Sequence, residues 1–309
     1  MGVTTPTARP LVDEAVLPVA TPIKPGRKIR NRRKYILFTV VPVTILCILW
    51  FIPTFGLLIS SFRAEDAVNE TGWWTVVTSP FADWTLDNYR EVLDSQGMGT
   101  AFLNSFVVSI PATVIPIIAA SFAAYAFAWM SFPGRNLLFA LLIALLVVPI
   151  YVAFIPILRI YGDLDLTGTF LAVWLAHTGF AMPLAVYLLR NYMSTLPKSI
   201  VESARLDGAS HYQIFWKLIM PLCTPVLAAF AILQFLWVWN DFLVALIFLG
   251  SDQENQIIQQ ALVRLIGSRG QDWHLLTAGG FIAMIVPLIV FFTLQRYFVR
   301  GLTAGSVKG

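Results

Sequence analysis

Charged residues are scarce in this sequence of 309 residues. Lys, Arg, Asp and Glu make up 12% of the chain, whereas they make up about a quarter of an ordinary soluble domain. Hydrophobic residues make up 58%, and the mean hydropathy is +0.74. An ordinary soluble domain is therefore excluded. The net charge of +4 is too small to indicate nucleic-acid binding, and we expect no nucleic-acid partner.

Cysteine is also scarce, and the sequence lacks common motifs of enzymes and metal sites. Cys47 and Cys223 lie in apolar runs far apart in the sequence, so a disulfide framework is not expected. There is no phosphate loop G-x-x-x-x-G-K-[ST], no H-E-x-x-H, no zinc-spaced Cys pair and no G-x-S-x-G. His177, His211 and His274 fall in a span and in two loops on opposite sides. We therefore expect a non-catalytic chain that binds no metal and no cofactor.

Long uncharged runs are abundant instead. A helix needs about 20 apolar residues to cross a bilayer, and in hydrocarbon its backbone groups must be hydrogen-bonded within the segment. Six runs are long enough, and only the fifth contains a charged residue, Asp241. Prolines at 111, 116, 149, 156 and 287 are expected to kink their helices. The sequence predicts an all-α integral membrane protein with six transmembrane helices at residues 35–62, 101–130, 137–158, 170–189, 222–250 and 275–295.

The positions of Lys and Arg predict the side of the membrane on which each loop lies. An even number of spans places both termini on one side, where sixteen Lys and Arg then lie, against five on the other side. Positive residues favour the cytoplasm, so both termini are expected to be cytoplasmic. The segments 63–100 and 251–274 are then outside, and 191–221 is the longest cytoplasmic loop.

The two ends of the chain differ from the membrane part. Residues 1–34 contain eight Lys and Arg and five Pro, a composition that does not bury a core. They are expected to form a basic, mostly disordered cytoplasmic tail near anionic membrane lipid. Residues 35–300 are expected to form one six-helix membrane domain, and residues 301–309 a short cytoplasmic tail.

The long cytoplasmic loop between the fourth and fifth spans predicts a structure of its own. Its 31 residues far exceed the usual length of a helix connection. Ser199 and Glu202 have the spacing of a capping box, which predicts the start of a short helix, and Gly208 suits its end in the left-handed conformation. A second helix is expected from near Ser210 toward Pro221 and the fifth span. Such a protruding element is suited to bind a cytoplasmic partner.

This loop resembles the EAA loop of ABC importer permeases, whose pattern is Glu-Ala-Ala, three residues, Gly, nine residues, Ile-x-Leu-Pro. The matching residues are Glu202, Ala204, Gly208 and Pro221, and the departures are Ser203 for Ala, Leu218 for Ile and Met220 for Leu. Other segments are similar, in the same order, to carbohydrate-uptake permeases of the maltose, α-glucoside and glycerol-phosphate type, at 86–89, 104–105, 132–135, 239–242 and 301–309. Within that group the chain is similar to the second, six-span permease of a heterodimeric pair.

The resemblance implies the type I ABC importer permease (MetI-like) fold in the plasma membrane of a prokaryote. In that family two permease subunits form the pathway, an ATPase dimer that holds ATP and Mg²⁺ supplies energy, and an extracytoplasmic sugar-binding protein delivers the substrate. The EAA helix docks in a cleft of the ATPase and moves the fifth span through Pro221. The coupling residues implied are Glu202, Ser203, Ala204, Asp207, Gly208 and Pro221. Ala204 would permit close approach to the ATPase, while Glu202 and Asp207 have the alternative of being solvated surface acids.

Two further regions have counterparts in the family. The outer loop at 251–274 resembles a loop of the family that reaches toward the sugar-binding protein. Its expected contacts with that protein are Gln253, Asn255 and Gln256, and Gln259 and Gln260 belong to the same amide-rich run. The alternative is that these side chains are only hydrated by solvent. In the fifth span, aromatic, amide and carboxylate groups suit sugar recognition along the substrate pathway, at Trp237, Trp239, Asn240 and Asp241. The alternative there is an interfacial aromatic belt with Asp241 reaching headgroup water.

Together these features predict a permease subunit of an ATP-driven importer for a neutral di- or oligosaccharide such as an α-glucoside. The spans contain no Lys or Arg that would favour a phosphate-bearing solute. A glycerol-phosphate or polyol solute on the same machine is the alternative. A secondary active carrier is a further one, although the chain has neither an internal repeat of the EAA segment nor the intramembrane ionisable residues of a proton relay.

Overall fold

The computed structural model describes residues 2, 35–78, 83–94, 97–266 and 272–303, with side chains up to residue 295. These residues are nearly all helical, and their one extended contact is an isolated antiparallel bridge between Arg63 and Trp84. The expected tail at 1–34 lies outside the described residues except for residue 2. The last helix runs to Thr303, so it continues three residues into the segment expected as the C-terminal tail.

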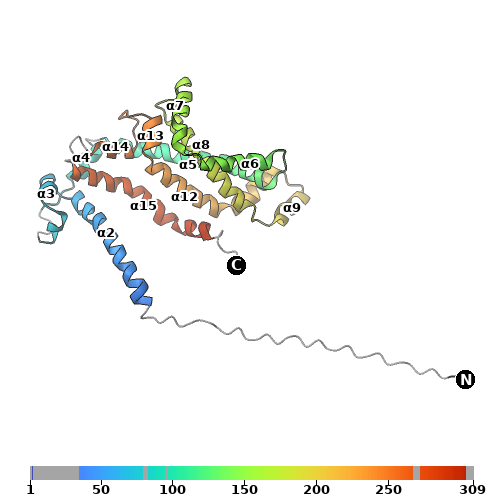
Figure 1. Cartoon of the computed structure of the whole chain (residues 1–309), viewed down its shortest axis with the longest axis horizontal. Coiled ribbons are helices and arrows are strands. Elements are labelled where there is room, and N and C mark those ends of the chain that lie inside the picture. The colour runs from blue at the N-terminus through green and yellow to red at the C-terminus, as the bar shows by residue number, and fades with distance from the viewer. Residues whose placement is uncertain (1, 3–34, 79–82, 95–96, 267–271, 304–309) are drawn as a thin grey trace. The chain divides into compact units, whose positions relative to one another are not determined.

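The elements follow one another along the chain as helices joined by short turns (Figure 1). They are η1 (Ile36–Val40), α2 (Val41–Ser61), α3 (Glu65–Glu70), η2 (Trp73–Val77), α4 (Asp87–Asp94), α5 (Met98–Trp129), α6 (Arg135–Ala144), η3 (Leu145–Val147), η4 (Ile150–Ala153), α7 (Phe154–Asp163), α8 (Phe170–Met193), α9 (Lys198–Leu206), α10 (His211–Ile214), η5 (Phe215–Ile219), α11 (Met220–Leu222), α12 (Thr224–Asn240), α13 (Leu243–Phe248), α14 (Ile258–Arg264) and α15 (Trp273–Thr303).

The chain divides into two compact units, residues 1–52 and residues 53–309. In the first, the described residues form η1 and the beginning of α2, and nearly all of their side chains are exposed. These side chains are mostly large and apolar, which suits an apolar environment such as lipid. The second unit contains the remaining helices and the buried core.

Among the described residues, four helices are long and apolar enough to cross a membrane, and two further pairs reach that length only as bent spans. The four long helices are Ile36–Ser61, Met98–Trp129, Phe170–Met193 and Trp273–Gln295. The bent pairs are Arg135–Val147 with Ile150–Asp163, at 100°, and His211–Leu222 with Thr224–Asn240, at 73°. The all-α membrane fold is confirmed, and six spans result when each bent pair counts as one. The kink expected at Pro149 is confirmed as a break in the helix predicted at 137–158. The helix predicted at 222–250 is not continuous, because α12 ends at Asn240 and α13 follows it.

Proline explains the break in the third span. Pro149 has no N–H to donate, and it disfavours the helical conformation of the residue before it. Val148 and Pro149 are accordingly extended, with ψ of 123° and 124°. The other four prolines expected to kink helices lie inside α5, α7 and α15, which continue through them.

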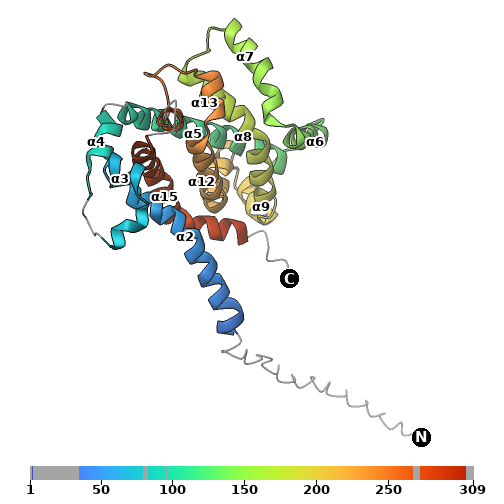
Figure 2. The ribbon, with the colours of Figure 1, turned by 60° about the vertical axis from the view of Figure 1, so that its left-hand side comes forward.

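Small residues allow the central helices to pack closely. Figure 1 and Figure 2 show α5, α8 and α12 side by side, and these three helices contact one another. Small side chains let membrane helices approach closely, and alanines are fully buried along α5 and α8 at positions 112, 120, 124, 172 and 185. The long helix α5 is therefore the centre around which the second unit is packed.

The segment before α5 is held by a buried arginine. Arg63 donates from its guanidinium to the main chain of Gly72 (3.2 Å) and to Thr75 Oγ1 (3.3 Å). Asn88 Nδ2 donates to the carbonyls of Ser61 (3.0 Å) and Arg63 (2.8 Å). Buried polar groups are stable only when hydrogen-bonded, and these bonds tie α4 to the end of α2.

Candidate functional site

The loop between α8 and α12 forms the two helices that its sequence predicts. The short helix α9 is followed by a glycine turn, and α10, η5 and α11 then lead into α12. Figure 1 shows α9 projecting at one end of the helices of the second unit. The predicted helix, turn and second helix are therefore confirmed.

Gly208 ends α9 in the conformation that glycine favours. Its φ is +81°, a value that costs other L-residues about 1 to 2 kcal/mol. The amide of Gly208 donates to Arg205 O (3.0 Å), and that of Ala209 donates to Ala204 O (2.9 Å). This pair of bonds is the Schellman motif, so Gly208 fixes the direction in which the chain leaves α9.

The capping box lies on the other helix. Helix α9 already begins at Lys198, after Pro197, and has no side-chain cap. The prediction that Ser199 and Glu202 cap it is wrong, because Ser199 lies inside its first turn. Ser210 instead accepts from the Gln213 amide (3.3 Å) and donates its own amide to Gln213 Oε1 (2.8 Å), so the box starts α10 and leaves Glu202 on the surface.

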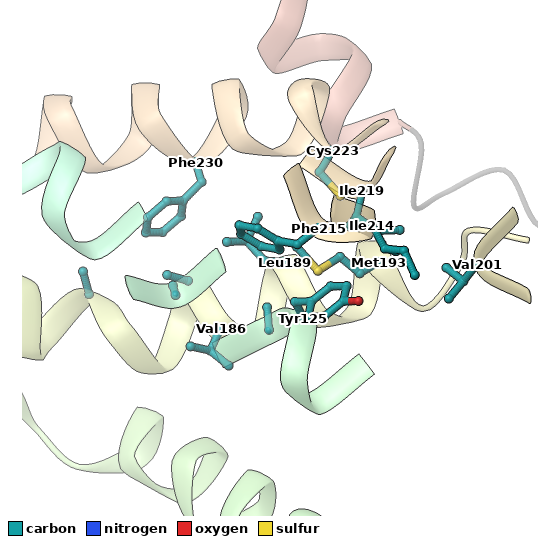
Figure 3. Close-up of a cluster of buried hydrophobic side chains, with 14 of the residues drawn as sticks. Tyr125, Val186, Leu189, Met193, Val201, Ile214, Phe215, Ile219, Cys223 and Phe230 are labelled. Carbon is teal, nitrogen blue, oxygen red and sulfur yellow. The ribbon is translucent and has the colours of Figure 1, made fainter. Parts of the chain in front are cut away.

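The two faces of α9 are used differently. Val201 and Ala204 are buried in a cluster with Met193, Ile214 and Phe215 (Figure 3). Ala204 is 8% exposed, so the close approach that it allows is to this chain's own helices. The expectation that Ala204 lies on a surface for the ATPase is therefore wrong for its side chain.

The opposite face of α9 is open. The implied coupling residues Glu202, Ser203 and Asp207 are exposed. Leu206, beside them, is 89% exposed, and sequence reasoning missed it. A leucine at the C-terminal end of a short polar helix, outside the apolar stripe formed by Val201 and Ala204, is the signal that identifies it.

The loop is attached to the end of α5 by two hydrogen bonds. Tyr125 OH and His211 Nδ1 are 2.9 Å apart, and Arg205 Nη2 donates to Trp129 O (3.3 Å). Phe215 packs against the Tyr125 ring, with ring centroids 5.4 Å apart. Helix α9 therefore contacts the end of α5 through Arg205, and α10 contacts it through His211 and packs beside it through Phe215.

Pro221 lies at the corner between the loop and α12. It is the second residue of α11, and its carbonyl accepts a hydrogen bond from Thr224 Oγ1 (2.8 Å) at the start of α12. The bend of 73° occurs at this corner. Its position suits the implied role of joining the loop to the fifth span.

The expected pathway residues of the fifth span do not form one cluster. Trp239 is fully buried, and its Nε1 donates to Ala283 O (3.1 Å). Trp237 is only half-buried and packs edge to face against His177, at 5.7 Å between ring centroids. Residues two positions apart point to nearly opposite sides of a helix, so Trp237 is the tryptophan of the two with a surface to offer a solute.

Asn240 and Asp241 end α12. Asn240 is exposed and donates from Nδ2 to Leu236 O (2.7 Å). Asp241 has an extended backbone, and its Oδ1 accepts from the Val244 amide (2.7 Å) at the start of α13. Asp241 thus caps a second short helix where the sequence predicts continuous span, because a carboxylate readily accepts bonds from the free amides of a helix start.

The outer loop uses several of its amide side chains internally. Gln260 donates to Gly250 O (2.6 Å) and accepts from the Ile257 amide (3.1 Å), and Gln259 donates to Trp239 O (3.3 Å). Asn104 Nδ2, on α5, donates to the carbonyls of Glu254 and Gln256 (2.8 and 3.0 Å). The outer loop is thereby fixed to α5 as well.

The expected binding-protein contacts are placed unequally. Gln253 is exposed, Asn255 is half-buried and Gln256 is buried. Gln253 and Gln256 line a polar cavity of about 580 Å³ together with Asp94 and Thr100. Gln253 is therefore the residue of the three with the most surface available to a partner.

Comparison with known proteins places the chain among transporters. A family model described as "Binding-protein-dependent transport system inner membrane component" matches residues 112–304. The osmoprotective compounds uptake permease protein GgtD of Synechocystis sp. is 56% identical over 92% of this chain and 98% of its own length. The alpha-glucoside transport system permease protein AglG of Rhizobium meliloti is 54% identical over 82% of this chain and 67% of its own.

More distant relatives extend the comparison. The melibiose/raffinose/stachyose import permease protein MelC of Bacillus subtilis is 32% identical over 84% of this chain and 92% of its own. A chain of a bacterial ABC transporter for the import of the acidic polysaccharide alginate has the same fold, with a TM-score of 0.71 at 23% identity over 87% of this chain and 98% of that one.

Proposed function

Since this chain belongs to the family of binding-protein-dependent transport system inner membrane components, a multi-pass permease family of sugar ABC importers, we propose that it forms half of the pathway for a neutral di- or oligosaccharide. The observation that carries its coupling role is α9, a short helix with one face anchored to α5 and the other open. The proposed solute class is the α-glucosides.

The exposed face of α9 is proposed to bind a cytoplasmic ATPase. Leu206 supplies apolar surface, and exposed large apolar side chains among polar ones often mark protein contacts. Glu202 and Asp207 supply charge at the same face, while Ala204 and Gly208 fix the helix and its exit turn. The ATPase would move α9, and the movement would pass to α5 through Tyr125 and Arg205 and to α12 through Pro221.

The proposed assembly contains this chain, a second permease subunit, an ATPase dimer and an extracytoplasmic sugar-binding protein. ATP and Mg²⁺ would be held by the ATPase, so this chain would be a non-catalytic subunit. Both termini and α9 would lie on the cytoplasmic side of a prokaryotic plasma membrane, as the distribution of Lys and Arg favours. The outer loop, with Gln253 at its surface, would face the sugar-binding protein.

Two relatives support different solutes. The AglG protein is named for α-glucosides and the GgtD protein for osmoprotective compounds, and they are similar to this chain to nearly the same degree. A small neutral osmoprotective solute is therefore the second candidate. The half-exposed Trp237 suits both, because an aromatic face packs against the C–H surface of a neutral polyhydroxylated solute.

The test is sugar-stimulated ATP hydrolysis by the purified complex in proteoliposomes. The complex is obtained through a tag on this chain, and α-glucosides, α-galactosides, neutral osmolytes and glycerol phosphate are supplied separately with the binding protein. We expect stimulation and uptake with an α-glucoside. Stimulation by glycerol phosphate alone would contradict the proposed solute class, and transport by this chain without an ATPase would contradict the whole assembly.

A further inference from the structure

A basic groove lies beside α9, between the last turn of α5 and the start of α6. Its volume is about 550 Å³, and Arg135, Lys198 and Arg205 line it against one carboxylate, that of Glu202. These three cations and one carboxylate give the lining a net charge of +2 without counting His211, which also lines the groove. The ion pairs of the described part of the chain include none of these three cations. Concave surfaces with unpaired positive charge attract anions.

Two of the three cations, Arg135 and Arg205, are hydrogen-bonded to the same short segment of main chain. Arg135 Nη1 donates to Met130 O (3.0 Å), and Arg205 Nη2 donates to Trp129 O (3.3 Å). These carbonyls belong to adjacent residues at the end of α5, so both guanidinium groups lie there. Each group has further N–H donors that can bind a ligand. The planar guanidinium group matches the geometry of phosphate oxygens.

The helix starts at the groove add to its positive potential. Arg135 is the first residue of α6 and Lys198 the first of α9, and neither helix has a side-chain cap or an acidic residue in its first turn. The start of a helix carries a partial positive charge, so a cation placed there is unfavourable unless an anion lies nearby. An anion in the groove would offset the charges of both helix starts and of the arginines.

The groove opens where polar and apolar surfaces meet. The apolar helix α5 ends at Trp129, and tryptophan is common at the membrane interface. From the groove, α6 continues with leucines that are more than half exposed, at positions 137, 138, 141 and, in η3, 145. A ligand with an anionic head and long apolar chains would satisfy both surfaces, whereas a soluble anion would satisfy only the first.

We propose that this groove binds the phosphate of an anionic phospholipid, with its acyl chains along the exposed leucines of α6. The phosphate would bridge Arg135 on α6 to Lys198 and Arg205 on α9. The site is independent of the transported solute. It would make the position of α9 depend on the lipid of the same leaflet.

The test is lipid binding to the purified complex, with phosphatidylglycerol as the probe and native mass spectrometry as the readout. The variant is Arg135→Gln with Lys198→Gln, and neither residue is among the proposed coupling residues. The control is Arg90→Gln with Arg159→Gln, which removes the same charge at exposed positions outside the groove. We expect phosphatidylglycerol to bind roughly 30-fold more weakly to the groove variant, because two basic contacts are lost, and equally to the control.

Three outcomes would overturn the proposal. Equal affinity of the groove variant and the control would show that the lipid binds elsewhere. Competition by inorganic phosphate at equal concentration would assign the groove to a soluble oxyanion. Binding of the lipid only after removal of the ATPase would assign the groove to the ATPase contact. Lipid affinity is measured without transport, so these outcomes leave the test of the importer separate.

Discussion

The loop that contains α9 and the outer loop after α13 are both rich in polar residues, yet they use them in opposite ways. The loop of α9 keeps Glu202, Ser203 and Asp207 exposed, and its apolar residues anchor it. The outer loop turns Gln259 and Gln260 inward to hydrogen-bond its own backbone and that of α12. Polarity in a loop therefore does not by itself indicate a partner surface, and the direction of each side chain decides its role.

The largest expected effect concerns the buried face of α9. Ala204→Asp places a carboxylate in the cluster around Phe215, and an unpaired buried charge costs about 3 to 5 kcal/mol. We expect the variant to lose the fold of the loop and to retain no ATPase. Thermal unfolding in detergent and pull-down of the ATPase measure both effects. Ser203→Asp is the control, because it puts the same charge on the exposed neighbour and should leave the melting temperature unchanged.

The next effect concerns the inward amides of the outer loop. Gln260→Ala removes two hydrogen bonds, each worth about 1 kcal/mol net, and should lower the free energy of unfolding by about 2 kcal/mol. Gln253→Ala should leave it unchanged, because its side chain is exposed. Equal unfolding of the two variants in a denaturant titration would contradict the contrast between the two loops.

A smaller effect is expected at the turn after α9. Gly208→Ala should destabilise the protein by about 1 to 2 kcal/mol, because alanine disfavours a positive φ. Gly162→Ala in α7 is the matched control, since a methyl group meets no atom within 4 Å at either position. That variant should be neutral or stabilising, because alanine favours a helix. A similar change in melting temperature for both variants would rule out the turn as the cause.

The smallest structural change tests the connection to α5. Tyr125→Phe removes only the hydroxyl that contacts His211. We expect a complex that still hydrolyses ATP but transports fewer solute molecules per ATP, because α10, which follows α9 in the same loop, is then attached less firmly to α5. The ratio of uptake to hydrolysis in proteoliposomes measures this. A double variant with His211→Phe should be no worse than either single variant, and additive losses would mean that the two residues act separately.

The sequence predicts the helices, the glycine turn, the family of this chain and, through Pro149, the position of the bend in the third span. It does not predict the break of the fifth span after Asn240. Hydropathy averages over a window, so it does not distinguish a straight span from a broken one, and in the third span only Pro149 indicates the bend. It also does not show that Asp241 caps α13. These features depend on hydrogen bonds between side chains and nearby backbone amides. The same is true of the capping residue in the loop, which is Ser210 and not Ser199.

The sequence predicts which residues form the candidate site on α9, but it predicts less well which way their side chains point. Motif spacing identifies Glu202, Ala204 and Gly208, and Gly208 has the predicted conformation. Spacing cannot show that Ala204 faces the core while Leu206 faces outward, because this depends on how α9 packs against α5 and α10. The contacts of Tyr125 with His211 and of Arg205 with Trp129 join residues more than 70 positions apart, which a single sequence does not reveal.

The most direct test of the account is a cross-link from the exposed face of α9 to the ATPase. Leu206→Cys is introduced after replacement of the exposed Cys47 and the buried Cys223 by alanine, and the complex in native membranes is treated with a short bifunctional cross-linker. We expect a product that joins this chain to a nucleotide-binding subunit, whereas Ala204→Cys should give none. A cross-link from Ala204→Cys, or none from Leu206→Cys in an intact and active complex, would contradict the account.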